Sequence, residues 1–273
     1  MVSQEQRRRQ LAREKFLRQQ QRRTSARRKS RMRNSVIASV LGVIVIGSVA
    51  LYTTNVFKND DKANASSETT PSASPSASKA PDPCEKAAAG KVQKLSWKKE
   101  PAMSIDTSAD YTMTLATTCG DIGIALKTAA APHTVNSFDF LASKGYFDHT
   151  KCHRLTTNGI YVLQCGDPTG TGSGGPGYTI PDENLKDKSL KGGVYPAGTV
   201  AMANTGQKHT GGSQFFLVYQ DSQLPASYTP FGTVDAAGLK VLKKIAAAGE
   251  NTGAGDGAPN ATVVINKATV SKS

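Results

Sequence analysis

The strongest constraint on this chain is the stretch of residues 34–57, in which no side chain is charged. Its centre, from Val36 to Tyr52, is dense in Val, Ile, Leu, Ala and Gly, and about 20 apolar residues suffice for a helix that crosses a bilayer. A cleaved signal peptide is the alternative, but its apolar run usually has roughly 7 to 15 residues behind a short basic region. The length of the run, and the 33-residue basic segment before it, favour a retained transmembrane anchor.

The charge of the chain is concentrated ahead of this anchor. The 273 residues include 34 Lys and Arg and 21 Asp and Glu, yet residues 1–33 alone hold 13 of the basic residues and two of the acidic ones. Basic flanks stay on the cytoplasmic side, so we expect the tail of residues 1–33 in the cytoplasm and the C-terminal part outside it. The tail could also contact anionic lipid or RNA. The nearly neutral remainder argues against nucleic-acid binding by the main domain.

Residues 58–107 are predicted to be a flexible linker that leads into the globular domain. From Asn59 to Pro83 the chain consists largely of Ser, Thr, Ala, Pro, Asp and Lys, without an aromatic residue or an aliphatic side chain larger than Ala. Such a segment cannot bury enough surface to offset its ordering entropy.

Residues 108–273 are predicted to form one mainly β, α+β domain dominated by antiparallel sheet. Two segments have a helical pattern, one capped by Thr134 and ending at Gly145, the other starting near Asp235 and ending at Gly249. Short apolar segments between turn signals predict the strands: Met113 to Thr117, Ile122 to Leu126, Ile160 to Gln164, Thr199 to Ala203, Gln214 to Tyr219 and Thr262 to Val270.

The four cysteines all follow the predicted anchor, where disulfides can form. Three pairings are possible, and sequence alone does not choose between them. Cys152 and Cys165 flank two apparently neighbouring strands, so we favour their pairing, with Cys84 bonded to Cys119. A zinc site at Cys152, His153 and Cys165 is the alternative, although the usual Cys-x-x-Cys pairs are missing, and no metal or other cofactor is expected.

The familiar catalytic and nucleotide-binding motifs are absent. The glycines from Gly170 to Gly175 match Gly-x-Gly-x-x-Gly, but Pro176 follows and prevents a helix from opening there, so we expect a surface loop at the edge of a groove. No Gly-x-Ser-x-Gly or His-Glu-x-x-His motif occurs. What remains is a set of residues suited to holding a peptide: Arg154, Tyr161, Gln164, Asn204, Gln214, Phe216 and Leu224.

Six ordered motifs resemble the signature of the cyclophilin-type peptidyl-prolyl isomerases, over about residues 110 to 272. They are His153-Arg154-Leu155, Gln164-Cys165-Gly166-Asp167-Pro168, Gly174-Gly175-Pro176-Gly177-Tyr178 with Asp182-Glu183, Met202-Ala203-Asn204, Gly212-Ser213-Gln214-Phe215-Phe216, and Phe231-Gly232. Two of these motifs occur as the variants Cys152-His153-Arg154 and Leu163-Gln164-Cys165-Gly166-Asp167. Together with the N-terminal anchor, these variants are similar to those of the membrane-anchored cyclophilins of actinobacteria. The resemblance implies an eight-stranded antiparallel β-barrel capped by two helices, with a shallow groove for an Xaa-Pro bond.

The resemblance also implies roles for individual residues. Arg154 would donate to the proline nitrogen of a twisted amide, with Gln164 and Phe216 as the other catalytic residues. The proline would lie among Phe216, Tyr161, Val162 and Leu224, with Tyr228 near the end of the groove. Gln164, Asn204, Gln214 and the main chain of Ala203 would hold the substrate backbone.

Three departures from the family pattern qualify this prediction. Gln223 stands where the best-known members have Trp, Tyr228 where they have His, and Tyr161-Val162 where they have Phe-Met. Two extra residues also lengthen the turn around Asn158-Gly159. We therefore expect an altered or shallower pocket and weak binding of cyclosporin-like ligands. The function expected is isomerisation of Xaa-Pro bonds in exported proteins, and the alternative is a tethered module that binds or chaperones Pro-containing segments with little catalysis.

Overall fold

The computed structural model describes residues 81–273, so the predicted basic tail, the anchor and most of the linker lie outside the described residues. Within this part of the chain there is no helix long and apolar enough to cross a membrane. The elements in chain order are β1 (Tyr111–Thr117), β2 (Gly120–Leu126), α2 (Pro132–Ser143), β3 (Thr150–Lys151), β4 (Arg154–Thr156), β5 (Val162–Cys165), the 3-10 helix η1 (Lys191–Gly193), β6 (Val194–Tyr195), β7 (Thr199–Met202), β8 (Phe215–Val218), β9 (Ser222–Gln223), β10 (Pro230–Val234), α3 (Ala236–Ala247), β11 (Asp256–Gly257) and β12 (Val264–Lys272).

The main sheet of residues 81–273 is antiparallel and runs in the order β11-β4-β5-β8-β7-β10-β2-β1-β12-β3. This sheet therefore has ten strands rather than the expected eight, because the two-residue strands β11 and β3 extend its two ends, and β6 and β9 form a separate two-stranded sheet. Only residues 152–153 separate β3 at one end from β4 near the other. Cys152 N–H donates to Val263 O at 3.0 Å and His153 N–H to Gln164 O at 3.1 Å, so the sheet closes on itself as a barrel.

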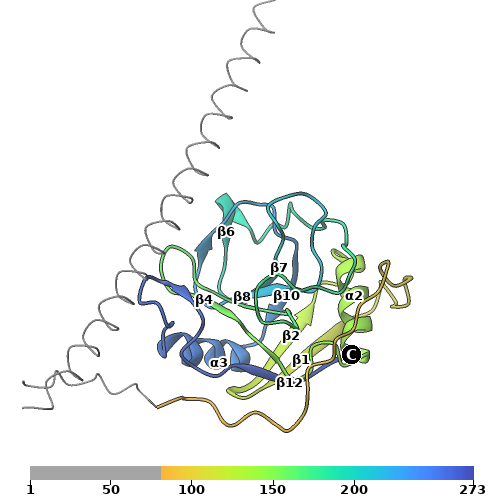
Figure 1. The fold of residues 1–273 in the computed structure, drawn as a ribbon. Helices are drawn as coiled ribbons and strands as arrows, with labels where there is room; N and C mark the ends of the chain where they lie inside the picture. The colour runs from red at the N-terminus through yellow and green to blue at the C-terminus, as the bar shows by residue number, and fades with distance from the viewer. Residues whose placement is uncertain (1–80) are drawn as a thin grey trace, which may run out of the picture. The chain divides into compact units, whose positions relative to one another are not determined.

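Two helices pack on the barrel, α3 against β2 and α2 against β12 (Figure 1). Asp235 caps α3 as expected and accepts from Gly238 N–H at 2.6 Å. The predicted cap of α2 is wrong, because the helix begins at Pro132 and Thr134 lies inside its first turn. The carboxylate of Glu183 takes the capping role and accepts from His133 N–H at 3.0 Å and from Thr134 N–H at 2.9 Å.

The strands bury side chains on both of their faces. On β8, Phe215 and Leu217 enter the main core, whereas Phe216 and Val218 belong to a second apolar cluster. On β5, Leu163 and Cys165 face the main core and Val162 the second cluster. Because successive side chains of a strand point to opposite faces, the second cluster lies on the outer face of the barrel wall.

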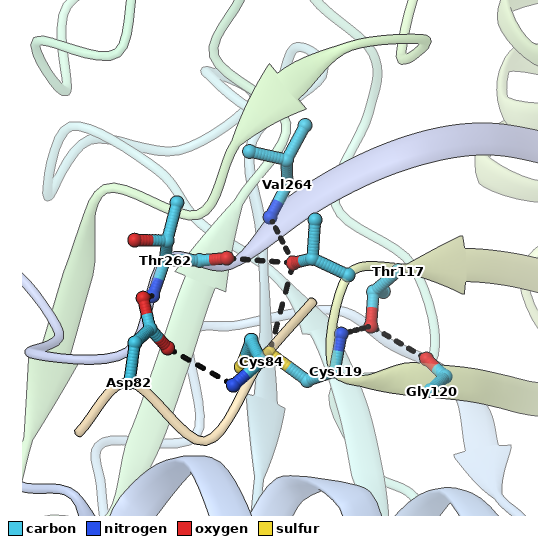
Figure 2. The surroundings of a disulfide bond; sticks show 8 residues. Asp82, Cys84, Thr117, Cys119, Gly120, Thr262 and Val264 are labelled. Atoms are coloured by element: carbon cyan, nitrogen blue, oxygen red, sulfur yellow. Dashed lines mark hydrogen bonds between the residues drawn. A yellow bond between two sulfur atoms is a disulfide. The ribbon is translucent and has the colours of Figure 1, made fainter. Parts of the chain in front are cut away.

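The segment before β1 is fixed to the barrel. A disulfide joins Cys84 to Cys119, at the turn between β1 and β2, and Glu85 N–H donates to Thr118 O at 2.8 Å. Figure 2 shows Asp82 beside this disulfide, where it accepts from Cys84 N–H at 3.0 Å and from Thr262 N–H at 2.9 Å. The part of the predicted linker that the structure describes therefore rests on the domain along its way to β1.

The second disulfide joins Cys152 to Cys165. Both pairings agree with the prediction from the sequence. The zinc site considered for Cys152 and Cys165 is incompatible with this structure, because both sulfur atoms are bonded to each other.

Candidate functional site

The candidate site begins with a row of residues that lie side by side across four strands. Arg154 on β4 pairs with Gln164 on β5, Gln164 with Phe216 on β8, and Phe216 with Ala201 on β7. Since residues paired across antiparallel strands project to the same face, these side chains emerge together on the outside of the barrel. Arg154 and Gln164 thus meet Phe216, which lies much further along the chain, in one place, as the resemblance implied.

A chain of polar contacts fixes the charged end of this row. The carboxylate of Asp256 accepts from Arg154 Nε and NH2, each at 2.7 Å, and Arg154 NH1 donates to Gln164 Oε1 at 3.1 Å. Gln164 Nε2 then donates to Gln214 Oε1 at 2.9 Å, and Gln214 Nε2 to Gly174 O at 2.9 Å. The Asp256 carboxylate raises the pKa of Arg154, and the guanidinium in turn lowers the pKa of Asp256. The site therefore holds a permanent cation in a defined orientation.

A cavity of about 200 Å³ with an apolar floor opens at this cation. It is lined by all the predicted site residues except Tyr161 and Gln214, and by Ile160 in addition. The second apolar cluster forms its floor, and the ring of Tyr228 stands edge-on to that of Phe216, with centroids 5.4 Å apart. We call this space the apolar cavity.

Tyr161 is placed differently from the expectation, whereas Gln214, expected to hold the substrate backbone, lies in the neighbouring cavity. The ring of Tyr161 packs edge-on against Tyr219, 5.9 Å between centroids, and its side chain borders the main core rather than the apolar cavity. Ile160, one residue earlier, takes the place expected for it. Gln214 does not line the apolar cavity but lines the neighbouring cavity. Its side chain accepts a hydrogen bond from Gln164, which lines both cavities.

Ala203 and Asn204 form the rim that the apolar cavity shares with its neighbour. Ala203 N–H donates to Gln214 O at 2.9 Å, and Asn204 Nδ2 donates to Ser227 O at 2.8 Å. The Asn204 side chain also accepts from Gly206 N–H at 2.9 Å. These bonds hold the rim in place next to Tyr228.

The neighbouring space is much larger, with a volume of about 1100 Å³, and we call it the flanking cavity. The glycine-rich loop from Gly172 to Gly177 forms one wall, as the sequence suggested for a loop at the edge of a groove. The carboxylate of Asp167 organises that loop, accepting from Thr169 N–H at 2.7 Å and Gly172 N–H at 2.6 Å. Gln164, Ala203 and Asn204 border both cavities, so the two spaces adjoin.

Sequence reasoning missed Asp256 as a partner of Arg154. This residue lies in the run Gly253-Ala254-Gly255-Asp256-Gly257, where nothing marks it as functional. The contact depends on β11 pairing with β4, with Asp256 opposite Thr156. A two-residue strand has no periodicity to detect, and no signal in the sequence could have found it.

The arrangement suits a ligand with one compact apolar ring and polar backbone around it. The Arg154 side chain is 38% exposed, so a bound molecule can reach the guanidinium. His153, the next residue, has no hydrogen-bond partner within the described residues for its buried ring nitrogens, and burial lowers its pKa. The site offers a fixed hydrogen-bond donor beside an apolar cup, on the wall of an antiparallel barrel with two helices.

Those features define a peptide-binding barrel of the cyclophilin class. The chain belongs to the cyclophilin-type peptidyl-prolyl cis-trans isomerase family, whose model matches residues 112–270. It is 48% identical over 199 residues to the probable peptidyl-prolyl cis-trans isomerase B of Mycobacterium leprae, a match that covers 70% of this chain and 63% of the relative. It is 41% identical over 125 residues to peptidyl-prolyl cis-trans isomerase B of Bacillus subtilis, covering 45% of this chain and 82% of that protein.

A solved structure is also similar. The cyclophilin-type isomerase of Cryptosporidium parvum is 25% identical and superimposes with a TM-score of 0.50, covering 60% of this chain and 99% of that one. The chain spans less than two thirds of the length of the mycobacterial relative described above.

Proposed function

We propose that this protein is a peptidyl-prolyl cis-trans isomerase that acts on Xaa-Pro bonds of polypeptides. The observation that carries the proposal is the guanidinium of Arg154 at the mouth of the apolar cavity, next to Phe216 and Gln164. The cavity volume of about 200 Å³ suits one small ring, and proline is the residue with a compact apolar ring in the backbone itself.

The reaction is a bond rotation and needs no nucleophile. Partial double-bond character gives a peptide bond a rotation barrier of about 18–20 kcal/mol, and prolyl isomers exchange slowly for that reason. In the twisted amide the proline nitrogen becomes pyramidal and can accept a hydrogen bond. A donor fixed at that position favours the transition state over both planar isomers.

Arg154 has donors left for this role. Within the described residues, Asp256 takes Nε and one N–H of NH2, and Gln164 takes one N–H of NH1. A guanidinium carries a further N–H on each terminal nitrogen. The bonds already formed orient the group, and the remaining N–H groups can face the substrate.

A catalytically weak module that binds Pro-containing segments is the second candidate. Two observations favour it: Tyr228 stands edge-on over Phe216, and Val162 lines the cavity where a longer side chain would reach further. Tyr228 and Val162 affect how well a proline ring fits the cavity, whereas the contact between Arg154 and Gln164 positions the donor that catalysis needs. The contacts of Arg154 favour the enzyme.

The N-terminal sequence supports a location for this activity. The basic residues 1–33 followed by the uncharged residues 34–57 have the pattern of a single-pass anchor with a cytoplasmic N-terminus. We propose that the isomerase domain acts outside the cytoplasm on exported proteins, and that the tail lies on anionic lipid. Protease added to intact cells should remove the domain, whereas a cytoplasmic domain would be protected.

A peptide isomerisation assay tests the proposed reaction. Full-length protein in a non-ionic detergent should accelerate cis-to-trans exchange of a neutral Xaa-Pro peptide, and Arg154→Ala should lose most of that acceleration while still binding the peptide. Leu224→Ala, which enlarges the apolar cavity and leaves the guanidinium in place, should mainly weaken binding. Equal, slow exchange with the wild type and with Arg154→Ala would support the binding module instead.

A further inference from the structure

Part of the flanking cavity's wall, next to the glycine-rich loop, is built by a segment outside the family match. Lys98, Lys99 and Glu100 line the cavity, although the match to the family begins only at residue 112. The cavity therefore contains a feature that belongs to the lead-in and lies outside the domain that the family model matches.

This segment is held firmly on both sides of the lysines. Before them, Trp97 N–H donates to Pro176 O at 2.8 Å, and the indole packs edge-on against Phe140 with centroids 5.0 Å apart. After them, Glu100 Oε1 lies 2.6 Å from His133 Nδ1. Asn136 Nδ2 of α2 donates to Ala102 O at 3.1 Å, and the lead-in rises beside that helix in Figure 1. Lys98 and Lys99 are thus presented at a defined place on the cavity wall.

Three charged residues line the cavity, and the two lysines outnumber the single carboxylate of Glu100. Both lysines are exposed, and within residues 81–273 neither forms an ion pair or a side-chain hydrogen bond. The carboxylate of Glu100 is already engaged by His133. The rest of the lining is uncharged, mostly Gly, Ser, Thr, Asn, Gln and Tyr. The described cavity therefore presents unpaired positive charge and many uncharged polar groups.

The two cavities adjoin at Gln164, Ala203 and Asn204. A substrate peptide that places its proline in the apolar cavity must pass this rim. A side chain of the substrate next to that proline can therefore enter the flanking cavity. We propose that Lys98 and Lys99 make the flanking cavity a subsite for an acidic side chain close to the Xaa-Pro bond. The inference rests on the proposed function and names its preferred substrates: Pro-containing segments with Asp or Glu within a few residues of the proline.

The test compares matched peptides that carry Glu, Gln or Lys at each position flanking one Xaa-Pro bond. With the full-length protein, one of the Glu peptides should have a higher kcat/KM than the Gln peptide with the substitution at the same position. Each lysine that pairs with the Glu side chain should raise kcat/KM roughly two- to fivefold, as expected for a partly exposed charge pair. The preference should reside mainly in KM and should shrink as ionic strength rises, since salt screens exposed charges.

The decisive variant is the double substitution Lys98→Gln with Lys99→Gln, which should bring the ratio of Glu to Gln peptide close to one. The matched control is Lys91→Gln with Lys94→Gln, which removes two exposed lysines of the same lead-in that do not line the cavity. The control should keep the preference. Because the basic residues 1–33 are present in every protein, attraction by that tail cancels from the comparison.

Several outcomes would overturn the proposal. A wild type that turns over the Gln peptides but shows no preference for Glu at any position contradicts it, as does a preference that survives Lys98→Gln with Lys99→Gln. Loss of activity on all peptides would instead count against the isomerase function. In that case the dissociation constants of the same peptides, measured by calorimetry, decide the subsite question: equal affinities for Glu and Gln peptides reject it.

Discussion

Asp256 holds the guanidinium of Arg154 with both carboxylate oxygens, although the two residues are 102 positions apart in the chain. The contact occupies the edge of the guanidinium defined by Nε and NH2, while NH1 contacts Gln164. Asp256 therefore acts on the proposed reaction by orienting Arg154, as a positioning residue.

Asp256→Asn should lower kcat by up to about tenfold with little change in KM, because a misplaced donor costs transition-state stabilisation more than ground-state binding. Peptide exchange kinetics at several substrate concentrations separate the two constants. Asp121→Asn, an exposed carboxylate in β2, is the matched control. A rise in kcat would show that the carboxylate attenuates the cation rather than orienting it.

Arg154→Lys keeps the positive charge but cannot form the two-point contact with Asp256. We expect it to resemble Arg154→Ala in kcat, since a flexible ammonium does not occupy the position of the guanidinium. Retention of more than about half of the wild-type kcat would mean that charge alone suffices. The same exchange assay gives the answer.

Replacing Cys152 and Cys165 by Ala removes their disulfide and should lower both the stability and the kcat of the protein. The bond closes a loop of 13 residues, for which chain entropy predicts a loss of about 3 kcal/mol on substitution by Ala. Cys152 lies two residues before Arg154 and Cys165 directly follows Gln164, so the bond also holds the strands that carry both.

The Cys84–Cys119 disulfide provides the comparison. It spans 35 residues and should cost at least as much stability when removed. It joins the lead-in to the β1–β2 turn and does not connect the strands that carry Arg154 and Gln164, so its removal should leave kcat on a neutral peptide nearly unchanged. Chemical denaturation gives the stabilities. Equal loss of kcat in both cysteine variants, measured where both remain folded, would contradict a specific role for Cys152–Cys165.

Acid should destabilise the loop around Asp167. Burial opposes ionisation of this carboxyl, but hydrogen bonds from the Thr169 hydroxyl and from the backbone N–H groups of Gly174, Thr169 and Gly172 outweigh it and lower the pKa from 3.8 to about 2. A lowered pKa in the folded state means that the stabilisation is present above pH 3.8 and is lost as pH falls towards 2. Thermal unfolding between pH 6 and 2 should show this decline.

Asp167→Asn should remove that part of the pH dependence and lower Tm at neutral pH, because the amide presents N–H groups where backbone donors converge. The variant should also disturb the wall of the flanking cavity. An unchanged acid limb in Asp167→Asn would assign the decline to other carboxyls, such as Asp187, whose pKa is also lowered: burial raises it, but hydrogen bonds from Lys127 and Ser189 outweigh that effect.

Cyclosporin should bind weakly. Gln223 stands where the best-known family members have Trp, and its Nε2 donates to Gly192 O at 2.8 Å, away from the apolar cavity. Calorimetry should therefore give a low affinity for the wild type and a higher one for Gln223→Trp. Tight binding by the wild type would contradict this expectation.

The sequence predicted those parts of the fold that depend on local patterns. The Asp235 cap and the helix containing Val135, Phe138 and Leu141 follow from short-range spacing. The two disulfides agree with the pairing that the sequence favoured but could not determine. The cap of α2 does not follow from short-range spacing, because Glu183 reaches it from 49 residues away and only the tertiary structure brings them together.

The candidate site shows the same division. The motifs around Arg154, Gln164 and Phe216 could be recognised in order, but their alignment in one row depends on strand pairing. Tyr161 was placed in the apolar cavity because it precedes Val162 in the motif, whereas in the structure its ring turns towards Tyr219 and Ile160 takes that place.

The closure of the barrel by residues 152–153 has a dynamic consequence. The strands on either side of this link are only two and three residues long, so few ladder hydrogen bonds hold the seam. Sparse bonding of this kind favours local opening at a lower free energy than global unfolding. Amide protons of β4 should then exchange with deuterium sooner than those of β1 and β2. The Cys152–Cys165 disulfide limits how far each opening event can separate Arg154 from Gln164, so the site can reform quickly while the remainder of the barrel stays intact.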